Sequence, residues 1–184
     1  MKIVDNFLDQ NEFDQLQNIF MVHPFAWYYQ DKNYNYAIDS SVDESDEPKF
    51  QFIHSFYGNG VPSSELFDRL NPFMMKLKPL SLYKIRANLL TKTPNIIENR
   101  FHDDLSNLKN RDDLPFLSKE KKKQWTTSIF YVNTNNGYTE FEDGTKVESI
   151  ANRIVTFPAS TVHRGTSCTD QNIRVIINFN YFTY

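Results

Sequence analysis

The sequence has a single cysteine, no excess of basic residues and no long apolar run. Because Cys168 is alone, an internal disulfide is excluded and a reducing compartment is indicated, so we expect a cytoplasmic protein. The formal charge of −3 offers no basic surface to a phosphate backbone, and we expect no binding to nucleic acid. No stretch approaches the roughly 18 apolar residues of a membrane helix, and the first residues lack the basic and apolar regions of a secretion signal. We therefore expect no membrane insertion.

Glycine is also scarce, and several catalytic signatures are absent. Five glycines stand beside 16 phenylalanines and 10 tyrosines, a composition typical of strands around a bulky core. The sequence contains no serine–histidine–acid pattern, no phosphate-binding glycine loop and no paired cysteines of a zinc site. Its length predicts one domain, residues 1–184, with a substantial core.

Two helices are expected in the first part of the chain. Asp9 is a predicted N-cap that opens a capping-box pattern, and apolar residues recur at helical spacing over 10–20. Ser63 or Ser64 is expected to cap a second helix over about 65–77.

Most of the remaining sequence is predicted as strands separated by turn residues. The expected strands cover 2–4, 25–29, 49–57, 82–90, 125–133, 139–142, 153–157 and 173–181. The expected helices come first in the chain and many short strands follow them. This order predicts a mainly β fold, a double-stranded β-helix (jelly roll) with N-terminal helices packed on one sheet.

Three residues have the spacing of a metal site. His102 and Asp104 are separated by one residue, so in an extended strand their side chains lie on the same side. His163 would add a second imidazole, and two imidazoles with one carboxylate can hold ferrous iron while leaving positions open for a cosubstrate and oxygen. The alternative is a strand end on which His102 and Asp104 simply face solvent.

Arg174 lies within the apolar strand 173–177, where a guanidinium needs an anionic partner. A dicarboxylate cosubstrate would supply that partner. The alternative is an internal ion pair with Glu140 or Glu142.

The other histidines and the cysteine are assigned to the fold. His23 is expected at the surface or in packing, and His54, on a Phe-rich strand face, is expected to be a hydrogen-bonded core residue. Cys168 has no candidate base nearby in sequence and is expected to pack.

Three segments resist assignment to strands. Residues 39–47 are acidic and turn-prone, while 91–99 and 105–123 flank the His102–Asp104 pair. The two flanking segments are expected to form a lid over substrate, with the lysines at 121–123 on its solvated edge.

Taken together, the motifs after residue 100 resemble those of the iron(II)/2-oxoglutarate-dependent dioxygenases, in particular the branch that looks like prolyl 4-hydroxylases. The resemblance is carried by His102-x-Asp104, the strand 127–133 with its turn into 137–141, the run 152–158, His163 and Arg174. The opening segment 4–8, followed by a helix, also resembles the entry segment of that branch.

The resemblance implies a role for each of these residues. His102, Asp104 and His163 would hold iron(II), and Arg174 would pair with the distal carboxylate of 2-oxoglutarate. Tyr131 matches the position whose hydroxyl joins that arginine at the carboxylate.

The neighbouring strand residues follow less directly from the same resemblance. Asn178 shares a strand face with Arg174 and would line the same pocket. Asn88 or Arg86 lies on the strand before His102 and Asp104 and would contact either the metal-side end of the cosubstrate or the substrate. Their spacing puts both side chains on one face of the strand, and the direction of that face is left open.

The implied activity is hydroxylation of an unactivated C–H bond, with oxygen and 2-oxoglutarate consumed. Proline in a peptide or protein is the first substrate implied, and a free amino acid or other small metabolite is the second. Asp104 at the carboxylate position favours hydroxylation over halogenation. The competing class is a non-enzymatic, cupin-like jelly roll that binds a metal or small ligand, which gives no role to Arg174 with Tyr131.

The sequence departs from the branch at two places. Asn136-Gly137 stands where the branch has a pair of glycines, and 105–123 is an insertion of unusual length. Both bear on the identity of the substrate, because loops select substrate in this fold.

Overall fold

The computed structural model describes residues 1–22, 24–31, 50–105 and 124–184. Some predictions lie outside these ranges: those for His23, for 39–47, and for 106–123, which includes the lysines at 121–123. No helix within them is long and apolar enough to cross a membrane.

The strands form two antiparallel sheets. The large sheet has the order β1–β9–β6–β11–β5–β3–β2 with β4 paired to β3, and the small sheet has the order β10–β7–β8. The strands are β1 Lys2–Val4, β2 Tyr28–Gln30, β3 Gln51–Gly58, β4 Val61–Pro62, β5 Ser81–Thr91, β6 Trp125–Tyr131, β7 Tyr138–Phe141, β8 Lys146–Glu148, β9 Arg153–Pro158, β10 His163–Gly165 and β11 Ile173–Phe182.

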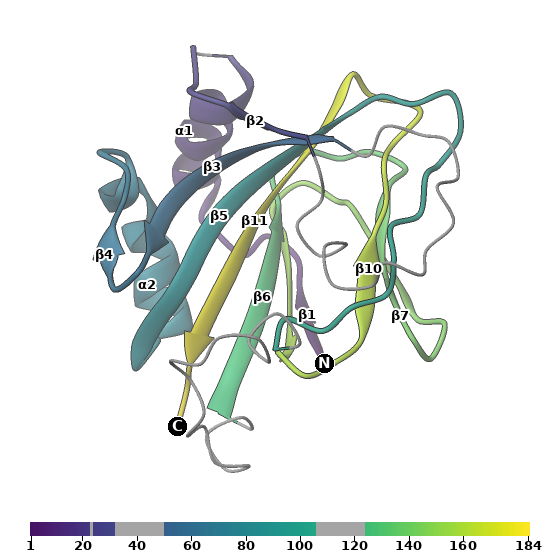
Figure 1. The fold of residues 1–184 in the computed structure, drawn as a ribbon. Helices are drawn as coiled ribbons and strands as arrows, with labels where there is room; N and C mark the ends of the chain where they lie inside the picture. The colour runs from purple at the N-terminus through teal and green to yellow at the C-terminus, as the bar shows by residue number, and fades with distance from the viewer. Residues whose placement is uncertain (23, 32–49, 106–123) are drawn as a thin grey trace.

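The helices lie on one side of the large sheet, and β7 and β10 lie on its other side (Figure 1). This arrangement confirms the predicted jelly roll with N-terminal helices against one sheet. The expected strands are present with small shifts of their ends, except that 25–29 is replaced by β2, which begins at Tyr28. Strands β4, β8 and β10 were not predicted, because two or three residues carry no measurable alternation.

Helix α1, Gln10–Met21, begins where its capping pattern predicts. The backbone N–H of Asp9 donates to the carboxylate of Glu12 at 3.4 Å, which satisfies a donor that the helix itself cannot use. Its buried residues are Phe13, Leu16 and Phe20, which form the stripe facing the sheet.

The second helix is shorter than predicted. A 3-10 helix, η2 Phe67–Leu70, precedes the α-helix α2, Asn71–Leu77. Pro72 explains the difference: it has no N–H to donate and its ring clashes with a preceding turn, so it is tolerated only at the start of an α-helix. The side chain of Ser64 therefore closes a local turn, accepting the N–H of Leu66 at 3.1 Å, and does not cap α2.

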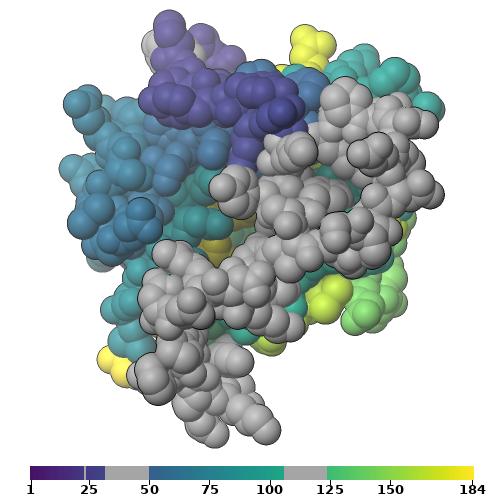
Figure 2. Space-filling view, in the orientation of Figure 1, coloured from purple at the N-terminus to yellow at the C-terminus, as the bar shows by residue number. Residues whose placement is uncertain are grey.

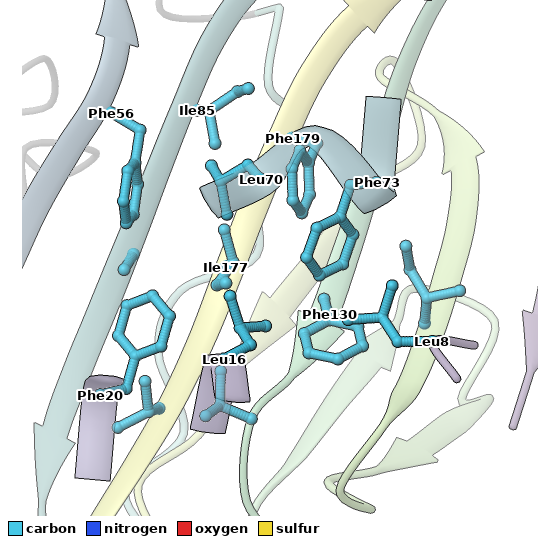
Figure 3. Close-up of a cluster of buried hydrophobic side chains, with 14 of the residues drawn as sticks. Leu8, Leu16, Phe20, Phe56, Leu70, Phe73, Ile85, Phe130, Ile177 and Phe179 are labelled. Atoms are coloured by element: carbon cyan, nitrogen blue, oxygen red, sulfur yellow. The ribbon is translucent and has the colours of Figure 1, made fainter. Parts of the chain in front are cut away.

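The main core fills the space between the helices and the large sheet (Figure 3). Phe130 of β6 contacts Phe13 of α1 and Phe73 of α2, with ring centroids 6.2 and 4.8 Å apart. A second cluster lies between the two sheets and includes Ile129, Phe141 and Phe157. The large sheet is therefore held on both faces, and the open part of its inner face is what positions the candidate site.

His54 and Cys168 belong to the fold, as predicted. The two ring nitrogens of His54 lie 2.8 Å from the carbonyl of Ala26 and 2.8 Å from the hydroxyl of Ser64. Cys168 is fully buried, and its thiol donates to the carbonyl of Gln171 at 3.3 Å.

Candidate metal centre and its pocket

His102, Asp104 and His163 are brought together by backbone pairing. The N–H of each histidine donates to the carbonyl of the other at 2.9 Å, and the N–H of Asp104 donates to Ala159 at 3.0 Å. The segment before β6 therefore runs antiparallel to β10. One ligand atom from each of the three residues lies within 4.8 Å of the other two, which is the cluster that the sequence predicts.

Hydrogen bonds orient the three side chains toward one point. Nδ1 of His102 lies 3.1 Å from the carbonyl of Arg100, and Nδ1 of His163 lies 2.9 Å from the carbonyl of Thr161. A carbonyl accepts, so each Nδ1 carries the hydrogen and each Nε2 keeps its lone pair for an ion.

The carboxylate of Asp104 is fixed in the same way. Its Oδ2 accepts from the hydroxyl of Thr127 and from the amide nitrogen of Asn180, the latter at 2.9 Å. These bonds leave Oδ1 as the oxygen available to an ion, and they satisfy the lone pairs that a metal would not take.

The protonation states also suit a metal. Burial opposes ionisation of Asp104, but the nearby His163 and His102, with the bond from Thr127, hold the pKa of its carboxyl below the ordinary value. Burial and the neighbouring His163 lower the pKa of His102. Neutral imidazole and ionised carboxylate are the forms that bind a cation.

A pocket that is open to solvent adjoins the cluster. Its floor is the inner face of β5 and β11, and its wall includes His102 and His163. The floor residues are Arg86, Asn88, Leu90, Arg174, Ile176 and Asn178. Figure 2 shows the yellow of β11 at the bottom of a hollow, beside the teal side chains of β5.

Arg174 is the most deeply buried charge on this floor. It is 1% exposed; its Nε donates to the hydroxyl of Ser149 at 2.9 Å, and its Nη2 has no hydrogen-bond partner among the residues that the structure describes. Burial lowers the pKa of the guanidinium. The stem of Arg174 packs on Gly137, where a Cβ would lie 2.7 Å from its Cδ, so this position admits only glycine.

The alternative of an internal ion pair for Arg174 is wrong. Glu140 is engaged by Arg164, with Nη2 and Oε2 2.5 Å apart, and lies 3.6 Å from Lys146. Among the residues that the structure describes, no carboxylate forms a salt bridge with Arg174.

Tyr131 lies beside Arg174, but its hydroxyl has another partner. The guanidinium carbon lies 5.8 Å from the centre of the Tyr131 ring, and the tyrosine hydroxyl donates to Thr139 at 2.8 Å. Burial raises the pKa of this hydroxyl. Thr139 itself lines the pocket, whereas Tyr131 lies behind it and is not one of the lining residues.

The remaining predicted residues all reach the pocket. Asn178 stands directly opposite Arg86 in the pairing of β11 with β5, and Asn88 stands opposite Ile176. This settles the direction that the sequence left open: the face that Arg86 and Asn88 share points into the pocket.

Four residues of the site were not predicted: Thr127, Asn180, Ser149 and Lys84. Three of them could have been found from strand spacing, because residues an even number of positions apart share a strand face. Asn180 shares its face with Asn178, Lys84 with Arg86, and Thr127 with Tyr131. Burial lowers the pKa of the Lys84 ammonium to about 8. Ser149 carried no signal, because it follows the very short strand β8.

Comparison with known proteins identifies the fold. No protein-family model matches the sequence, and no curated protein matches it. Solved structures do match. A prolyl hydroxylase from Trichoplax adhaerens, in complex with a peptide of hypoxia-inducible factor, aligns over 98% of this chain and 82% of its own, with a TM-score of 0.61 and 12% identity.

Two enzymes of nogalamycin biosynthesis are similar to the same degree. A non-haem alpha-ketoglutarate-dependent epimerase covers 98% of this chain and 75% of its own, with a TM-score of 0.61 and 14% identity. A carbocyclase described in the same terms covers 98% and 78%, with a TM-score of 0.62 and 12% identity. At these identities the similarity shows the fold, which is the double-stranded β-helix of the 2-oxoglutarate–iron(II) oxygenases.

Proposed function

We propose that this protein is an iron(II)- and 2-oxoglutarate-dependent dioxygenase that hydroxylates an unactivated C–H bond. The observation that carries the proposal is Arg174, a buried guanidinium with no carboxylate partner in the described part of the chain, in the same pocket as His102 and His163. A metal cluster alone fits many proteins, whereas a metal cluster with a buried cation beside it calls for an anionic ligand of the metal.

The residues present fit iron. His102 and His163 each offer Nε2, because the Nδ1 of each ring is bonded to a backbone carbonyl. Asp104 offers Oδ1, because its Oδ2 is bonded to Thr127 and Asn180. This is a two-histidine, one-carboxylate donor set on one side of the ion. Iron(II), when bound, supplies the open positions at which 2-oxoglutarate and oxygen are activated.

The protein's own residues bind and orient the cosubstrate. Arg174 donates to its distal carboxylate, and the ring of Tyr131 lies against the guanidinium. Asn178 and Asn88 line the floor of the same pocket. Ile176 and Ile129 give this part of the pocket an apolar surface that excludes water.

The overall reaction balances without another reductant. One substrate C–H becomes C–OH, one oxygen atom enters the product, and the other enters succinate as 2-oxoglutarate loses carbon dioxide. Substrate, oxygen and 2-oxoglutarate thus give alcohol, succinate and carbon dioxide.

Two substrate classes are supported by the structural neighbours. The prolyl hydroxylase neighbour holds a peptide, which supports a prolyl residue in a peptide or protein. The enzymes of nogalamycin biosynthesis support a small molecule. We also propose a cytoplasmic location, supported by the single, buried Cys168.

The test is an anaerobic titration with iron(II) and then 2-oxoglutarate, followed by the weak visible charge-transfer band of the chelate. Wild type should show the band, and His163→Ala and Asp104→Asn should lose it. Asp103→Asn is the matched control, because Asp103 is the adjacent carboxylate and its Oδ1 accepts the N–H of Leu105 at 2.8 Å. A folded wild type that binds iron but never shows the band would support the cupin-like, binding-only alternative.

A further inference from the structure

The polar atoms that lack partners gather in the pocket. Five buried side-chain nitrogen or oxygen atoms have no hydrogen-bond partner in the part of the chain that the structure describes. Four belong to residues that line the pocket: Nε of Arg86, Oδ1 of Asn88, Nη2 of Arg174 and Oδ1 of Asn178. Buried polar groups are ordinarily paired, so this concentration marks a surface that a ligand completes.

The four atoms form two separate groups. Arg174 stands opposite Leu90, whereas Arg86 stands opposite Asn178, four residues further along β11. At about 3.3 Å per residue the two positions are about 13 Å apart along the strand. With the distal carboxylate of 2-oxoglutarate at Arg174 and its other carboxylate held by the metal, both carboxylates of the cosubstrate would have cationic partners other than Arg86.

A charge count reaches the same conclusion. Among the described residues of the pocket and its metal cluster, Arg174, Arg86 and Arg100 bring one positive charge each and iron(II) would bring two, against one negative charge on Asp104 and two on 2-oxoglutarate. Two positive charges remain, and Lys84, on the same face of β5 as Arg86, adds to them. Within the described residues, the carboxylate that acts on both Arg86 and Lys84 is Asp104, which the metal would engage.

The unpaired amide oxygens specify a second group. Oδ1 of Asn88 and Oδ1 of Asn178 are acceptors and flank Arg86, one on the same strand and one directly across from it. A bound 2-oxoglutarate dianion offers acceptors only, so it cannot satisfy them. An ammonium or amine can, because it has hydrogens to donate.

We propose that the substrate is a free amino acid, whose carboxylate is bound by Arg86 and whose amino group donates to Asn88 or Asn178. The proposal rests on the proposed function and selects the second of its two substrate classes. Arg86 lies in the middle of β5, between β3 and β11, at the floor of the pocket. A free amino acid carries both the carboxylate that Arg86 would bind and the amine that the two asparagines would accept, within a few bonds of the carbon to be oxidised.

The first experiment measures binding without turnover. Iron-loaded protein is titrated anaerobically, with and without 2-oxoglutarate, with each of the common L-amino acids, and the midpoint of thermal unfolding and the heat of binding are recorded. At least one amino acid should bind, its carboxamide should bind at least tenfold more weakly, and its deaminated analogue should also bind more weakly. With oxygen present, the same amino acid should increase succinate formation.

Variants then assign the carboxylate to Arg86. Arg86→Met should weaken amino acid binding at least tenfold and should weaken 2-oxoglutarate binding by less. The amino acid affinity of Arg86→Lys should lie between those of wild type and Arg86→Met, because a lysine keeps the charge but loses the planar fork. Arg174→Met should show the reverse preference. Arg69→Met, a change at an exposed arginine of η2, is the control and should match wild type.

Stability gives a readout that does not depend on activity. An arginine with a structural partner destabilises the protein when it is removed, whereas an unpaired buried arginine does not. Arg86→Met should therefore unfold at the same temperature as ligand-free wild type or higher, and a clear fall would assign Arg86 to the fold.

The outcomes separate the two proposals. If 2-oxoglutarate chelates the iron but no amino acid binds, the amino acid proposal is overturned and the oxygenase stands. The same follows if the carboxamide binds as well as the acid, or if Arg86→Met binds the amino acid as well as wild type does. Equal binding of the deaminated acid overturns the assignment of Asn88 and Asn178. If the chelate never forms, the oxygenase proposal fails, and binding of amino acids to the iron-loaded protein still decides the role of Arg86.

Discussion

The two faces of β5 and β11 differ although they share the same backbone. On the outer face, Ile85, Ile177 and Phe179 are fully buried against the helices (Figure 3). On the inner face, Leu90 and Ile176 lie among polar residues, and Arg86 and Arg174 each keep a buried nitrogen that has no partner within the described residues. Because both faces share one ladder of backbone hydrogen bonds, the side chains alone account for the difference.

This contrast shows how the protein separates stability from binding. The outer face stabilises the fold by burying apolar area. The inner face lowers the free energy of unfolding, because it holds charges that only a ligand satisfies. A rigid outer core lets the inner face hold unpaired groups in fixed positions before a ligand arrives. Substitutions on the two faces should therefore change different measurements.

The largest effect is expected from the outer face. Phe130→Ala removes a fully buried ring that packs on Phe13 and Phe73, and it should lower the free energy of unfolding by about 3–5 kcal/mol. Urea unfolding followed by circular dichroism measures this change. Met75→Ala, at a side chain that is 75% exposed, is the control and should cost about 0.5 kcal/mol or less. Equal effects at the two positions would contradict the assignment of the core.

A change at Arg174 should weaken ligand binding and leave the fold intact. Arg174→Met removes the donors to the distal carboxylate, so we expect the affinity for 2-oxoglutarate to fall by about 2–4 kcal/mol while iron still binds. The free energy of unfolding should stay near the wild-type value, because the bond to Ser149 is the one side-chain hydrogen bond recorded for Arg174 within the described residues. An unchanged affinity for 2-oxoglutarate would move Arg174 to a structural role.

A smaller effect is expected from the groups that hold the metal ligands. Asn180→Ala and Thr127→Val each remove one donor to Oδ2 of Asp104, and each should reduce iron affinity about 10- to 100-fold. Iron titration under anaerobic conditions measures the change. Thr126→Val, at a neighbouring hydroxyl whose partner is Thr183, should bind iron like wild type. If all three variants behave alike, the orientation of Asp104 does not depend on these bonds.

Spacing along the chain carried most of the information about the site. The alternation of Arg86 with Asn88 was readable because side chains of a strand alternate. The same rule paired His102 with Asp104, although the structure has His102 at an isolated bridge to His163 and Asp104 in the turn that follows. The same alternation cannot say which face points inward, so the direction of Arg86 required the structure. Its pairing with Asn178 required the register of β11 against β5, which depends on the whole sheet.

The predictions that were wrong have local causes. The α-helix expected from 65 begins at Asn71, because Pro72 cannot lie inside an α-helix, and the serines before it attracted a cap assignment. For Arg174 the sequence predicts a dicarboxylate cosubstrate as partner. The alternative, an ion pair with Glu140 or Glu142, is wrong, because Arg164 already engages Glu140, which a sequence does not show. Ion pairs are set by tertiary geometry, whereas alternation is set by the strand itself.

The smallest effect should come from an arginine that does have a partner. Arg153 of β9 donates to both oxygens of Asp5, at 2.5 and 3.0 Å, and this bond holds the pKa of the Asp5 carboxyl below its usual value. A lowered pKa in the folded state means that the stabilisation is present above about pH 4 and is lost as the pH falls through the folded value. The side chain of Asp5 is 54% exposed, so solvent screening limits the contribution to well under about 1 kcal/mol.

Arg153→Met should therefore lower the free energy of unfolding slightly at pH 7, and by less in 1 M salt or at a pH where Asp5 is protonated. Arg174→Met and Arg86→Met should show no such fall at either pH. Urea unfolding of the three variants at pH 7 and near pH 3 makes the comparison. A loss of stability at Arg174 or Arg86 that matches or exceeds the loss at Arg153 would mean that the inner arginines serve the fold, and the separation between the two faces of the sheet would not hold.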